Sequence, residues 1–302
     1  MPALLRLSSD PRIVIEAVVT QPDRPRGRGQ QVAGSAVKDA ALEAGLHVYQ
    51  PEKIKSDSAY EFMTRVAPDA VVIIAYGQII PARLLDIPRL GWINLHASLL
   101  PRYRGAAPIN WAILHGETRT GLTTMRIDAG LDTGPVLLQQ ELEIGPDETA
   151  PQLAARMSEA GAPLMLETLV KLARGEIAPV PQDQTQASFA PLLKKEHGRI
   201  NWTHNARRIY DRIRALDPWP GAYTSFRGQI CHLWGRPHSA DRAPAEALPA
   251  GSLRVHKGEL VVACGGGEWL LVTEAQVEGR KRLPAKEFVH GARLAAGEQF
   301  RD

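Results

Sequence analysis

The sequence predicts an α/β domain built on a Rossmann-like parallel sheet, followed by a small OB-like β-barrel. Its 302 residues are enough for two domains with separate cores. Strand-like and helix-like segments alternate in the first half, which is typical of a parallel α/β sheet. After Tyr223, short strand-like segments alternate with turn residues, as in a small barrel. We therefore expect the α/β domain over residues 1–175, a linker over 176–202 and the barrel over 203–302.

The elements of the first domain follow from apolar periodicity and from helix and strand breakers. The expected strands before residue 100 are Ile15–Thr20, Val48–Pro51, Asp69–Ala75 and Trp92–His96. The expected helices are Met1–Ser8, Ala36–Ala44, Ser58–Val66, Ile79–Leu85 and Ile109–Leu114. Two more strands and a long helix that bends at Gly161-Ala162-Pro163 complete the domain, over Leu122–Ile127, Val136–Ile144 and Glu148–Arg174. The continuous apolar run in Asp69–Ala75 is typical of a strand covered on both faces.

Two polar side chains share one face of the expected strand Trp92–His96. Because side chains alternate along a strand, Asn94 and His96 point the same way. Ligands of a parallel α/β sheet bind beyond the carboxyl ends of its strands, which is where this pair lies. An amide and an imidazole side by side can donate hydrogen bonds to an oxygen that gains negative charge during acyl transfer. Structural hydrogen bonding within the core is the alternative explanation.

Asp132 is the best candidate partner for His96. It lies in the turn-rich segment Ile127–Pro135, between two expected strands. A carboxylate beside His96 would favour the charged imidazolium and fix the orientation of the ring. On its own, however, an aspartate in such a segment is equally typical of a turn.

Longer motifs surround these three residues. The expected strand is followed by SLLPRYRGAAPI (Ser98–Ile109), and Asp132 lies within GLDTGP (Gly130–Pro135). Together with Asn94 and His96, these motifs resemble the folate-dependent formyltransferases. The run from Ser98 is most similar to the members of that family that act on methionyl-tRNA, and the resemblance extends over essentially the whole chain.

The resemblance implies transfer of a formyl group from 10-formyltetrahydrofolate to the α-amino group of methionine on initiator tRNA, in support of translation initiation. Asn94 would hydrogen-bond the oxyanion of the tetrahedral intermediate, and His96 would donate another hydrogen bond or protonate the leaving folate nitrogen. Asp132 would tune His96 and help to deprotonate the amine. The resemblance also implies that no metal is required and that four consecutive residues line the folate pocket, namely Ser98, Leu99, Leu100 and Pro101.

The chain opens with a helix-like segment, Met1–Ser8, which is an unusual beginning for a doubly wound domain. The resemblance implies a preceding strand and a Gly-Thr-Pro loop at the centre of the sheet. We therefore expect the physiological start to lie upstream of Met1. A chain without that strand would expose ladder groups and core, which leaves a catalytically impaired tRNA-binding protein as an alternative.

An arginine-rich segment, Gln21–Gln31, is a candidate RNA contact. It contains two prolines, two glycines and three arginines, so we expect no regular structure there. Arginine offers planar, forked donors to phosphates and stacks on bases. The resemblance implies that this loop meets the acceptor end of the tRNA, with Arg28 and Arg26 as the candidate residues. A solvated surface loop is the alternative.

The basic residues are unevenly distributed. Residues 1–184 contain 18 Lys and Arg against 21 Asp and Glu, whereas residues 185–302 contain 18 against 12. This excess suits a polyanion such as RNA, or else a solvated basic surface. Within it, the resemblance places Lys194 and Lys195 against the tRNA, although adjacent lysines in a linker are often only solvated.

The second domain is predicted to begin with an amphipathic helix over Asn205–Leu216 and to end with a helix over Pro284–Leu294. Its expected strands are Tyr223–Phe226, Ile230–Trp234, Ser252–His256, Glu259–Cys264 and Trp269–Glu274. The glycine run Gly265–Gly267 joins two of them and lacks the helix-opening context of a nucleotide-binding loop, so we expect a hairpin turn.

Composition excludes several classes of protein. The two cysteines, Cys231 and Cys264, form no metal-binding pattern and fit a reducing cytoplasm. No uninterrupted apolar run approaches the ~18 residues that span a bilayer, and no export signal is visible. We expect a cytoplasmic monomer with no membrane partner.

Two rival enzyme classes have to be weighed. A formyltransferase acting on a nucleotide sugar or on glycinamide ribonucleotide would need neither an arginine-rich loop nor a basic barrel. A dinucleotide-dependent oxidoreductase would need a glycine-rich turn after its first strand; none is visible, but we expect the chain to begin after the place where that turn would lie.

Overall fold

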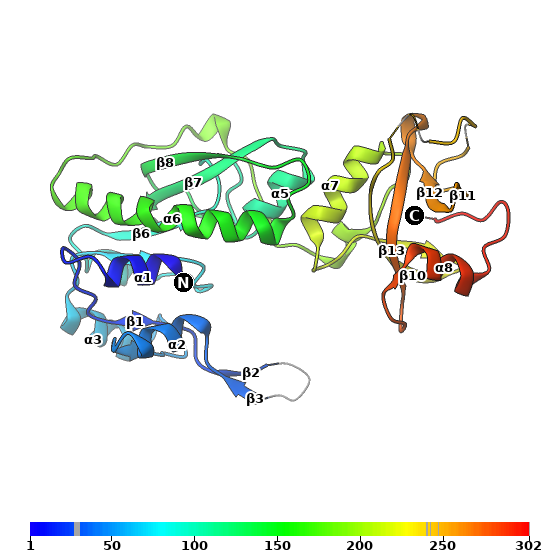
Figure 1. Ribbon diagram of the computed structural model, residues 1–302. Helices are drawn as coiled ribbons and strands as arrows, with labels where there is room; N and C mark the ends of the chain where they lie inside the picture. The colour runs from blue at the N-terminus through cyan, green and yellow to red at the C-terminus, as the bar shows by residue number, and fades with distance from the viewer. Residues whose placement is uncertain (27–30, 240, 242, 247, 302) are drawn as a thin grey trace. The chain divides into compact units, whose positions relative to one another are not determined.

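The computed structural model describes residues 1–26, 31–239, 241, 243–246 and 248–301. The chain divides into two compact units, which are described separately below (Figure 1). The first unit comprises Met1–Pro108, Arg119–Glu143 and Ala154–Ala190. The second comprises Ile109–Thr118, Ile144–Leu153 and Pro191–Asp302. The α/β elements therefore belong to the first unit and the barrel strands to the second.

The main sheet of the first unit is mixed rather than parallel. Its order is β5 (Val71–Ile73), β6 (Trp92–His96), β7 (Arg119–Arg126) and β8 (Val136–Glu143). Strand β5 runs parallel to β6, whereas β7 is antiparallel to both β6 and β8. A separate parallel pair is formed by β1 (Val18–Val19) and β4 (Val48–Tyr49). The α/β class is confirmed, and β1–β4 and β5–β6 are its parallel strand pairs.

The helices of the first unit agree with the expected positions to within a few residues. They are α1 (Pro2–Ser8), α2 (Ala36–Glu43), α3 (Asp57–Val66) and α4 (Ala82–Leu85), with α5 (Pro108–Leu114) and α6 (Ala150–Ala173) each shared between the units. Serine side chains cap α2 and α3: Ser35 accepts from the Lys38 N–H and Ser56 from the Ala59 N–H. The secondary structure of α6 is uninterrupted at Pro163, where a bend or break was expected.

Strand β6 is covered on both faces. Ile93 belongs to one apolar cluster with Leu137 of β8 and with the Met165–Leu172 part of α6. On the other face Trp92 packs in a second cluster with α3 and α4, and its indole N–H donates to the Leu84 carbonyl. Burial on both faces fixes the register of β6, because a slip of one residue would move each side chain to the opposite face.

Strand β5 is less buried than its sequence predicts. Val71, Val72 and Ile73 are only partly buried, and Ile74 is 44% exposed. Among the described residues β5 pairs with β6 alone, so one side of the strand has no ladder partner. The apolar run was correctly assigned to a strand, and it has apolar cover on both faces: Val72 packs against one cluster, and Val71 and Ile73 pack against the other.

The arginine-rich segment also differs from its prediction. Arg24–Arg26 (β2) pairs antiparallel with Gln31–Ala33 (β3), and Pro25 lies opposite Val32. Two-stranded ribbons tolerate a proline because each strand has a free edge toward which the missing N–H can face. The expectation of no regular structure was therefore wrong for β2. Arg28 lies outside the described residues.

The second unit is built on an antiparallel sheet, against which helices α7 (Ala206–Leu216) and α8 (Ala285–Ala292) pack. The sheet order is β11 (Leu253–His256), β12 (Glu259–Ala263), β13 (Trp269–Val277), β10 (Gln229–Pro237) and β9 (Tyr223–Phe226), with β14 (Leu283–Pro284) beside β13. The C-terminal segment bridges both outer strands, because Arg301 pairs with Ser225 and Gln299 with Ser252. This bridging joins the two edges of the sheet, as a barrel requires.

Helices α7 and α8 pack on one apolar cluster. Helix α7 (Ala206–Leu216), capped by Asn205, contributes Ile209 and Ile213, and α8 (Ala285–Ala292) contributes Phe288. Alternate residues of the strands face them, including Cys231, Leu233, Val262, Leu270 and Val272. The Gly265–Gly267 run turns between the antiparallel strands β12 and β13, as expected for a hairpin.

We expect Cys231 and Cys264 to be inert in the native protein. They are 0% and 4% exposed, and burial raises the pKa of each thiol to about 12. Since the thiolate is the reactive form, a thiol probe such as dithiobis(nitrobenzoic acid) should label neither residue at pH 8 and both after unfolding in guanidinium. Rapid labelling of the native protein would contradict this packing.

Candidate active site

The site is built on the carboxyl end of β6, as the sequence predicts. Asn94 lies opposite Met125 and His96 opposite Thr123 of β7, and both side chains stand on the face that begins with Trp92. His96 is 6% exposed, whereas Asn94 is only partly buried. Along this face, Trp92 and His96 are therefore buried, whereas the amide of Asn94 between them is partly accessible.

The imidazole of His96 is oriented by the backbone. Its Nε2 lies 2.9 Å from the carbonyl oxygen of Tyr103. A carbonyl oxygen can only accept, so Nε2 must carry a proton and donate it. Tyr103 is held in the left-handed region at φ +59°, which directs the loop after β6 back toward the histidine. The other ring nitrogen, Nδ1, is consequently the atom that can exchange a proton.

Asp132 faces that second nitrogen. Its Oδ2 lies 3.7 Å from Nδ1 of His96, beyond direct hydrogen-bond distance but close enough to attract the ring when the imidazole is protonated. The same Oδ2 accepts a 2.8 Å hydrogen bond from the backbone N–H of Gly105. Asp132 itself lies in the left-handed region at φ +51°, which is uncommon for a residue other than glycine. The pairing of His96 with Asp132 is therefore a feature of the fold.

The turn that carries Asp132 is closed by its own side chains. Asp128 accepts hydrogen bonds from the Gly130 N–H and from the Thr133 hydroxyl. A Cβ atom at Gly134 would lie 1.8 Å from the carbonyl oxygen of Arg126, so no larger residue fits there without a backbone shift. Gly134 of the GLDTGP motif thus allows the close approach of this turn to β7, and Gly130 leaves room for the Thr133 side chain.

The amide of Asn94 is available to a substrate. Its side chain forms no hydrogen bond with any residue in the described ranges, and it stands on the same face as His96. An amide N–H pair beside an imidazole that carries its own carboxylate can stabilise an oxyanion and move one proton. The three residues suit acyl transfer to an amine.

Ser98 has a structural environment. It is 0% exposed, its hydroxyl donates to the Arg102 carbonyl at 2.5 Å, and its own carbonyl accepts from the Thr123 hydroxyl at 2.6 Å. The Thr123 hydroxyl in turn accepts from the Leu100 N–H at 3.1 Å. The two hydrogen bonds of the Thr123 hydroxyl tie the loop to β7. The Ser98 hydroxyl closes the turn that ends at Arg102.

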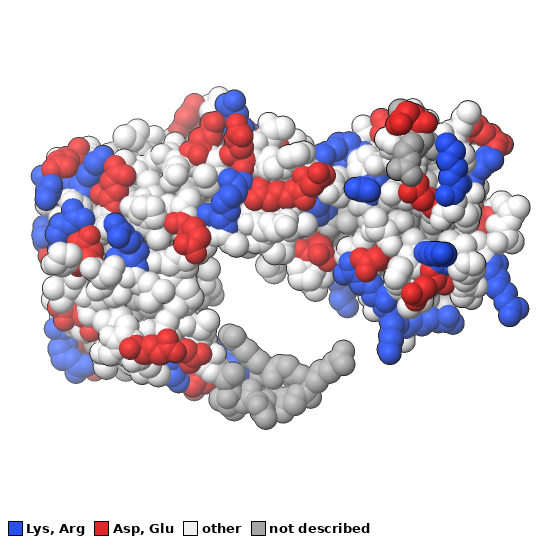
Figure 2. All heavy atoms as spheres, in the orientation of Figure 1, with Lys and Arg blue, Asp and Glu red and all other residues white. Residues whose placement is uncertain are grey.

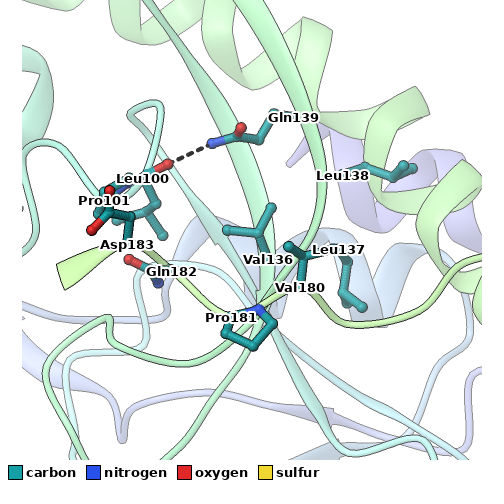
Figure 3. Close-up of a pocket in the computed structure, with 10 residues that line it drawn as sticks. All are labelled: Leu100, Pro101, Val136, Leu137, Leu138, Gln139, Val180, Pro181, Gln182 and Asp183. Atoms are coloured by element: carbon teal, nitrogen blue, oxygen red, sulfur yellow. Dashed lines mark hydrogen bonds between the residues drawn. The ribbon is translucent and has the colours of Figure 1, made fainter. Parts of the chain in front are cut away.

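A cavity of about 380 Å³ lies beside the second half of this loop (Figure 3). It is lined by Leu100 and Pro101, by Val136–Gln139 of β8, and by Val180–Asp183. The Gln139 side chain donates to the Leu100 carbonyl at 2.8 Å and so fixes one wall. Of the four residues expected at a folate pocket, Leu100 and Pro101 line this cavity, whereas Ser98 and Leu99 do not.

The residues expected to contact tRNA are only partly described. Arg28 and the side chain of Arg26 lie outside the described part of the structure. Lys194 and Lys195 belong to the second unit, at the start of the 3₁₀ turn Lys195–Gly198, and both are exposed. The Lys194 ammonium lies 3.7 Å from the Glu196 carboxylate, an exposed pair that contributes little to stability.

Three further residues of the site were not found from the sequence. Gly105 donates its N–H to the carboxylate of Asp132. Gln182 bonds the backbone of Asp132, and Arg104 bonds the side chain of Gln182. Arg104 and Gly105 belong to the SLLPRYRGAAPI run, which points to them only as a group. Gln182 stands 50 residues after Asp132, and no local signal connects the two.

Two absences concern only the part of the chain that the structure describes. No group of three or more metal-binding side chains gathers there. Nor is any helix in that part long and apolar enough to span a bilayer.

Known proteins are similar to this chain over nearly its whole length. Two family models match the chain: formyl transferase over residues 5–169, and formyl transferase, C-terminal domain, over residues 192–293. A methionyl-tRNA formyltransferase from Solibacter usitatus is 54% identical over 287 residues, which cover 95% of this chain and 90% of the relative. A methionyl-tRNA formyltransferase from Acidobacterium capsulatum is 51% identical over 296 residues, covering 97% and 92%.

Solved structures share the fold at much lower identity. HypX from Aquifex aeolicus, in complex with tetrahydrofolic acid, has a TM-score of 0.61 at 18% identity and covers 86% of this chain and 45% of its own. WlaRD, a sugar 3N-formyl transferase, has a TM-score of 0.62 at 16% identity and covers 93% and 94%. Such likeness supports the architecture alone.

Proposed function

We propose a function from one premise, that the chain belongs to the formyl transferase family. It transfers the formyl group of 10-formyltetrahydrofolate to the α-amino group of methionine on initiator tRNA, and so supports translation initiation. The observation that carries this assignment is the match of nearly the whole chain to relatives named methionyl-tRNA formyltransferase. The site at the end of β6 supplies groups that suit the reaction.

In this proposal Asn94 stabilises the charge that develops on the formyl oxygen. The methionine amine attacks the formyl carbon, and the carbonyl oxygen becomes the oxyanion of a tetrahedral intermediate. An amide donor aimed at that oxygen binds it more strongly than the neutral carbonyl of the donor, which lowers the barrier. The free amide of Asn94 and its place beside His96 support this role.

His96 and Asp132 would move the protons. The attacking amine must lose a proton, and the departing folate nitrogen must gain one. With Nε2 donating to the Tyr103 carbonyl, Nδ1 is the atom that takes or gives the proton, and the Asp132 carboxylate stabilises the imidazolium that forms. The 3.7 Å separation leaves room for the amine or a water molecule to bridge the two groups.

The donor would bind next to the loop after β6. The cavity lined by Leu100 and Pro101 has a volume within the range of small-molecule sites and is mostly apolar with a few polar groups. Ser98 and Leu99 would act by shaping the loop, since Ser98 is engaged with Arg102. The folate complex of HypX, which shares the fold, is consistent with a folate donor.

The acceptor tRNA would be bound by basic side chains. The arginine-rich segment supplies Arg26, the last residue of β2, and Arg28 two residues later in the sequence, and Lys194 and Lys195 are exposed residues of the second unit. Figure 2 shows lysine and arginine side chains gathered along the lower side of the second unit, in the part of the chain with the basic excess. Phosphate contacts of this kind supply affinity and orientation without reading sequence.

The rival acceptors have less support. WlaRD acts on a sugar but resembles this chain in fold alone, at 16% identity. A small acceptor would give no role to the arginine-rich segment Gln21–Gln31 or to the basic residues of the second unit. We further propose that the protein acts as a monomer in the cytoplasm, where two buried, unpaired cysteines are stable.

The first test is formyl transfer to methionyl initiator tRNA by the wild-type chain and by Asn94→Ala. Loss of one oxyanion donor is expected to lower kcat about 10²- to 10³-fold. The matched control is Gln140→Ala, which removes an exposed amide from β8 and should leave kcat unchanged. A wild-type chain that transfers formyl to no methionyl-tRNA would refute the function, whereas normal turnover by Asn94→Ala would refute only the role of Asn94.

The second test concerns the tRNA surface. The double change Lys194→Glu and Lys195→Glu should raise KM for tRNA several-fold and weaken its salt dependence, with kcat unchanged, because phosphate contacts are lost. Lys53→Glu with Lys55→Glu is a matched control, since these are two exposed lysines of the first unit. Equal effects of the two pairs would show that overall charge, and not this site, is responsible.

A further inference from the structure

Gln182 bonds the backbone of the turn that carries Asp132. Its side-chain amide nitrogen, Nε2, donates to the Asp132 carbonyl at 2.9 Å and to the Gly134 carbonyl at 2.6 Å. The residue is only 9% exposed. One side chain thus uses both of its N–H groups on a single turn, on either side of Thr133.

Arg104 fixes the orientation of that amide. Its Nε and Nη2 donate to the Gln182 side-chain oxygen at 3.1 and 2.6 Å. A guanidinium can only donate, so the oxygen of Gln182 must face Arg104 and the nitrogen must face the turn. A rotated amide would oppose donors to donors on one side and acceptors to acceptors on the other.

The environment of Arg104 is unusual for a charged group. It is 3% exposed, and within the described residues it forms no ion pair with a carboxylate. Its charge is instead met by the side-chain oxygens of Gln182 and of Gln184, the latter at 2.8 Å. Burying a cation without a counter-ion costs free energy, and packing alone does not require a charged group here. The charge of Arg104 therefore points to a role in holding its glutamine partners.

The loop around Arg104 is pinned by a neighbouring segment of chain. The Arg104 N–H donates to the Ser188 carbonyl at 2.8 Å, and the Ala190 N–H donates to the Arg104 carbonyl at 2.7 Å. On either side of Arg104, Tyr103 orients His96 and Gly105 holds the Asp132 carboxylate. The segment that contains Gln182 therefore supports the histidine and the aspartate together.

Asp132 needs this support, because its backbone lies at φ +51°. Such conformations cost of order 1–3 kcal/mol and persist only when the surroundings over-determine them. Here the Gln182 amide holds the carbonyl of Asp132 and the Gly105 N–H holds its carboxylate. Without the first bond, the residue can relax toward an extended or helical backbone and move its carboxylate away from His96.

We propose that Gln182, oriented by Arg104, is a positioning residue for Asp132 in formyl transfer. The proposal rests on the function proposed above and concerns no direct contact between Gln182 and the reacting atoms. Its action is to keep the Asp132 carboxylate opposite Nδ1 of His96. The consequence is a rate effect that passes entirely through Asp132.

The primary test is Gln182→Ala in formyl transfer to methionyl-tRNA. We expect kcat to fall about 10- to 100-fold, as for a catalytic group displaced by about 1 Å, with KM for both substrates within about twofold of wild type. Gln182 also lines the cavity beside Leu100 (Figure 3), so a raised KM for the folate donor with normal kcat would assign it to donor binding and overturn the proposal.

Two variants separate positioning from general loss of structure. Gln182→Glu keeps the volume and the contact with Arg104 but cannot donate to the two carbonyls, and we expect its kcat to fall at least as far as that of Gln182→Ala. The matched control is Gln184→Ala, which removes one Arg104 contact but leaves the bonds of Gln182 to Arg104 and to the turn in place, and it should leave kcat within about twofold. Equal losses from Gln184→Ala and Gln182→Ala would overturn the proposal.

The dependence on Asp132 is tested in the Asp132→Asn background. If Gln182 acts through Asp132, adding Gln182→Ala should lower kcat by less than about twofold there, because interacting residues are not additive. A full 10- to 100-fold loss in that background would show that Gln182 acts by another route.

A readout that does not need activity keeps the two proposals apart. The Gly105 N–H is protected by its bond to the Asp132 carboxylate, so its hydrogen exchange should accelerate in Gln182→Ala and not in Gln184→Ala. Unchanged exchange would overturn the positioning role. A wild-type chain with no formyl transfer but the expected exchange pattern would refute the function and leave the positioning of Asp132 standing.

Discussion

The hydrogen bond from the Gly105 N–H to the Asp132 carboxylate is the constraint on which the site depends. It joins the loop after β6 to the turn before β8, which stand 27 residues apart in the chain. Because Tyr103 on the same loop accepts from His96, one short segment sets the positions of both the imidazole and the carboxylate. Strand β6, from which this loop extends, is itself held in place because it packs between two apolar clusters.

Strand β6 and its polar face could be predicted from the sequence because they depend on local alternation. The bounds Trp92–His96 agree, and Asn94 and His96 share a face. The proximity of Asp132 to His96 required the resemblance as well, since periodicity carries no information about which turn meets which strand. Gln182 was missed for the same reason: its partners lie 48 and 50 residues away. The expected folate and tRNA residues remain predictions.

The direction of the strands was the second feature that the sequence did not predict fully. Alternation of strands and helices predicted a parallel sheet, but β7 and β8 are joined by a turn rather than a helix and run antiparallel. Strand β5 packs against apolar clusters on both faces, as its composition predicts, but among the described residues its ladder partner is β6 alone. The pairing of Arg24–Arg26 with Gln31–Ala33 shows that a proline is compatible with a short paired strand.

The state of His96 tests the account most directly. In ¹⁵N NMR of the wild-type protein, with the His96 signal assigned from a His96→Gln variant, the neutral ring should be protonated on Nε2, because that atom donates to the Tyr103 carbonyl. Nδ1 would then be free to exchange a proton beside Asp132. A neutral ring protonated on Nδ1 would contradict the arrangement, since Nε2 and the carbonyl oxygen would oppose one another as two acceptors.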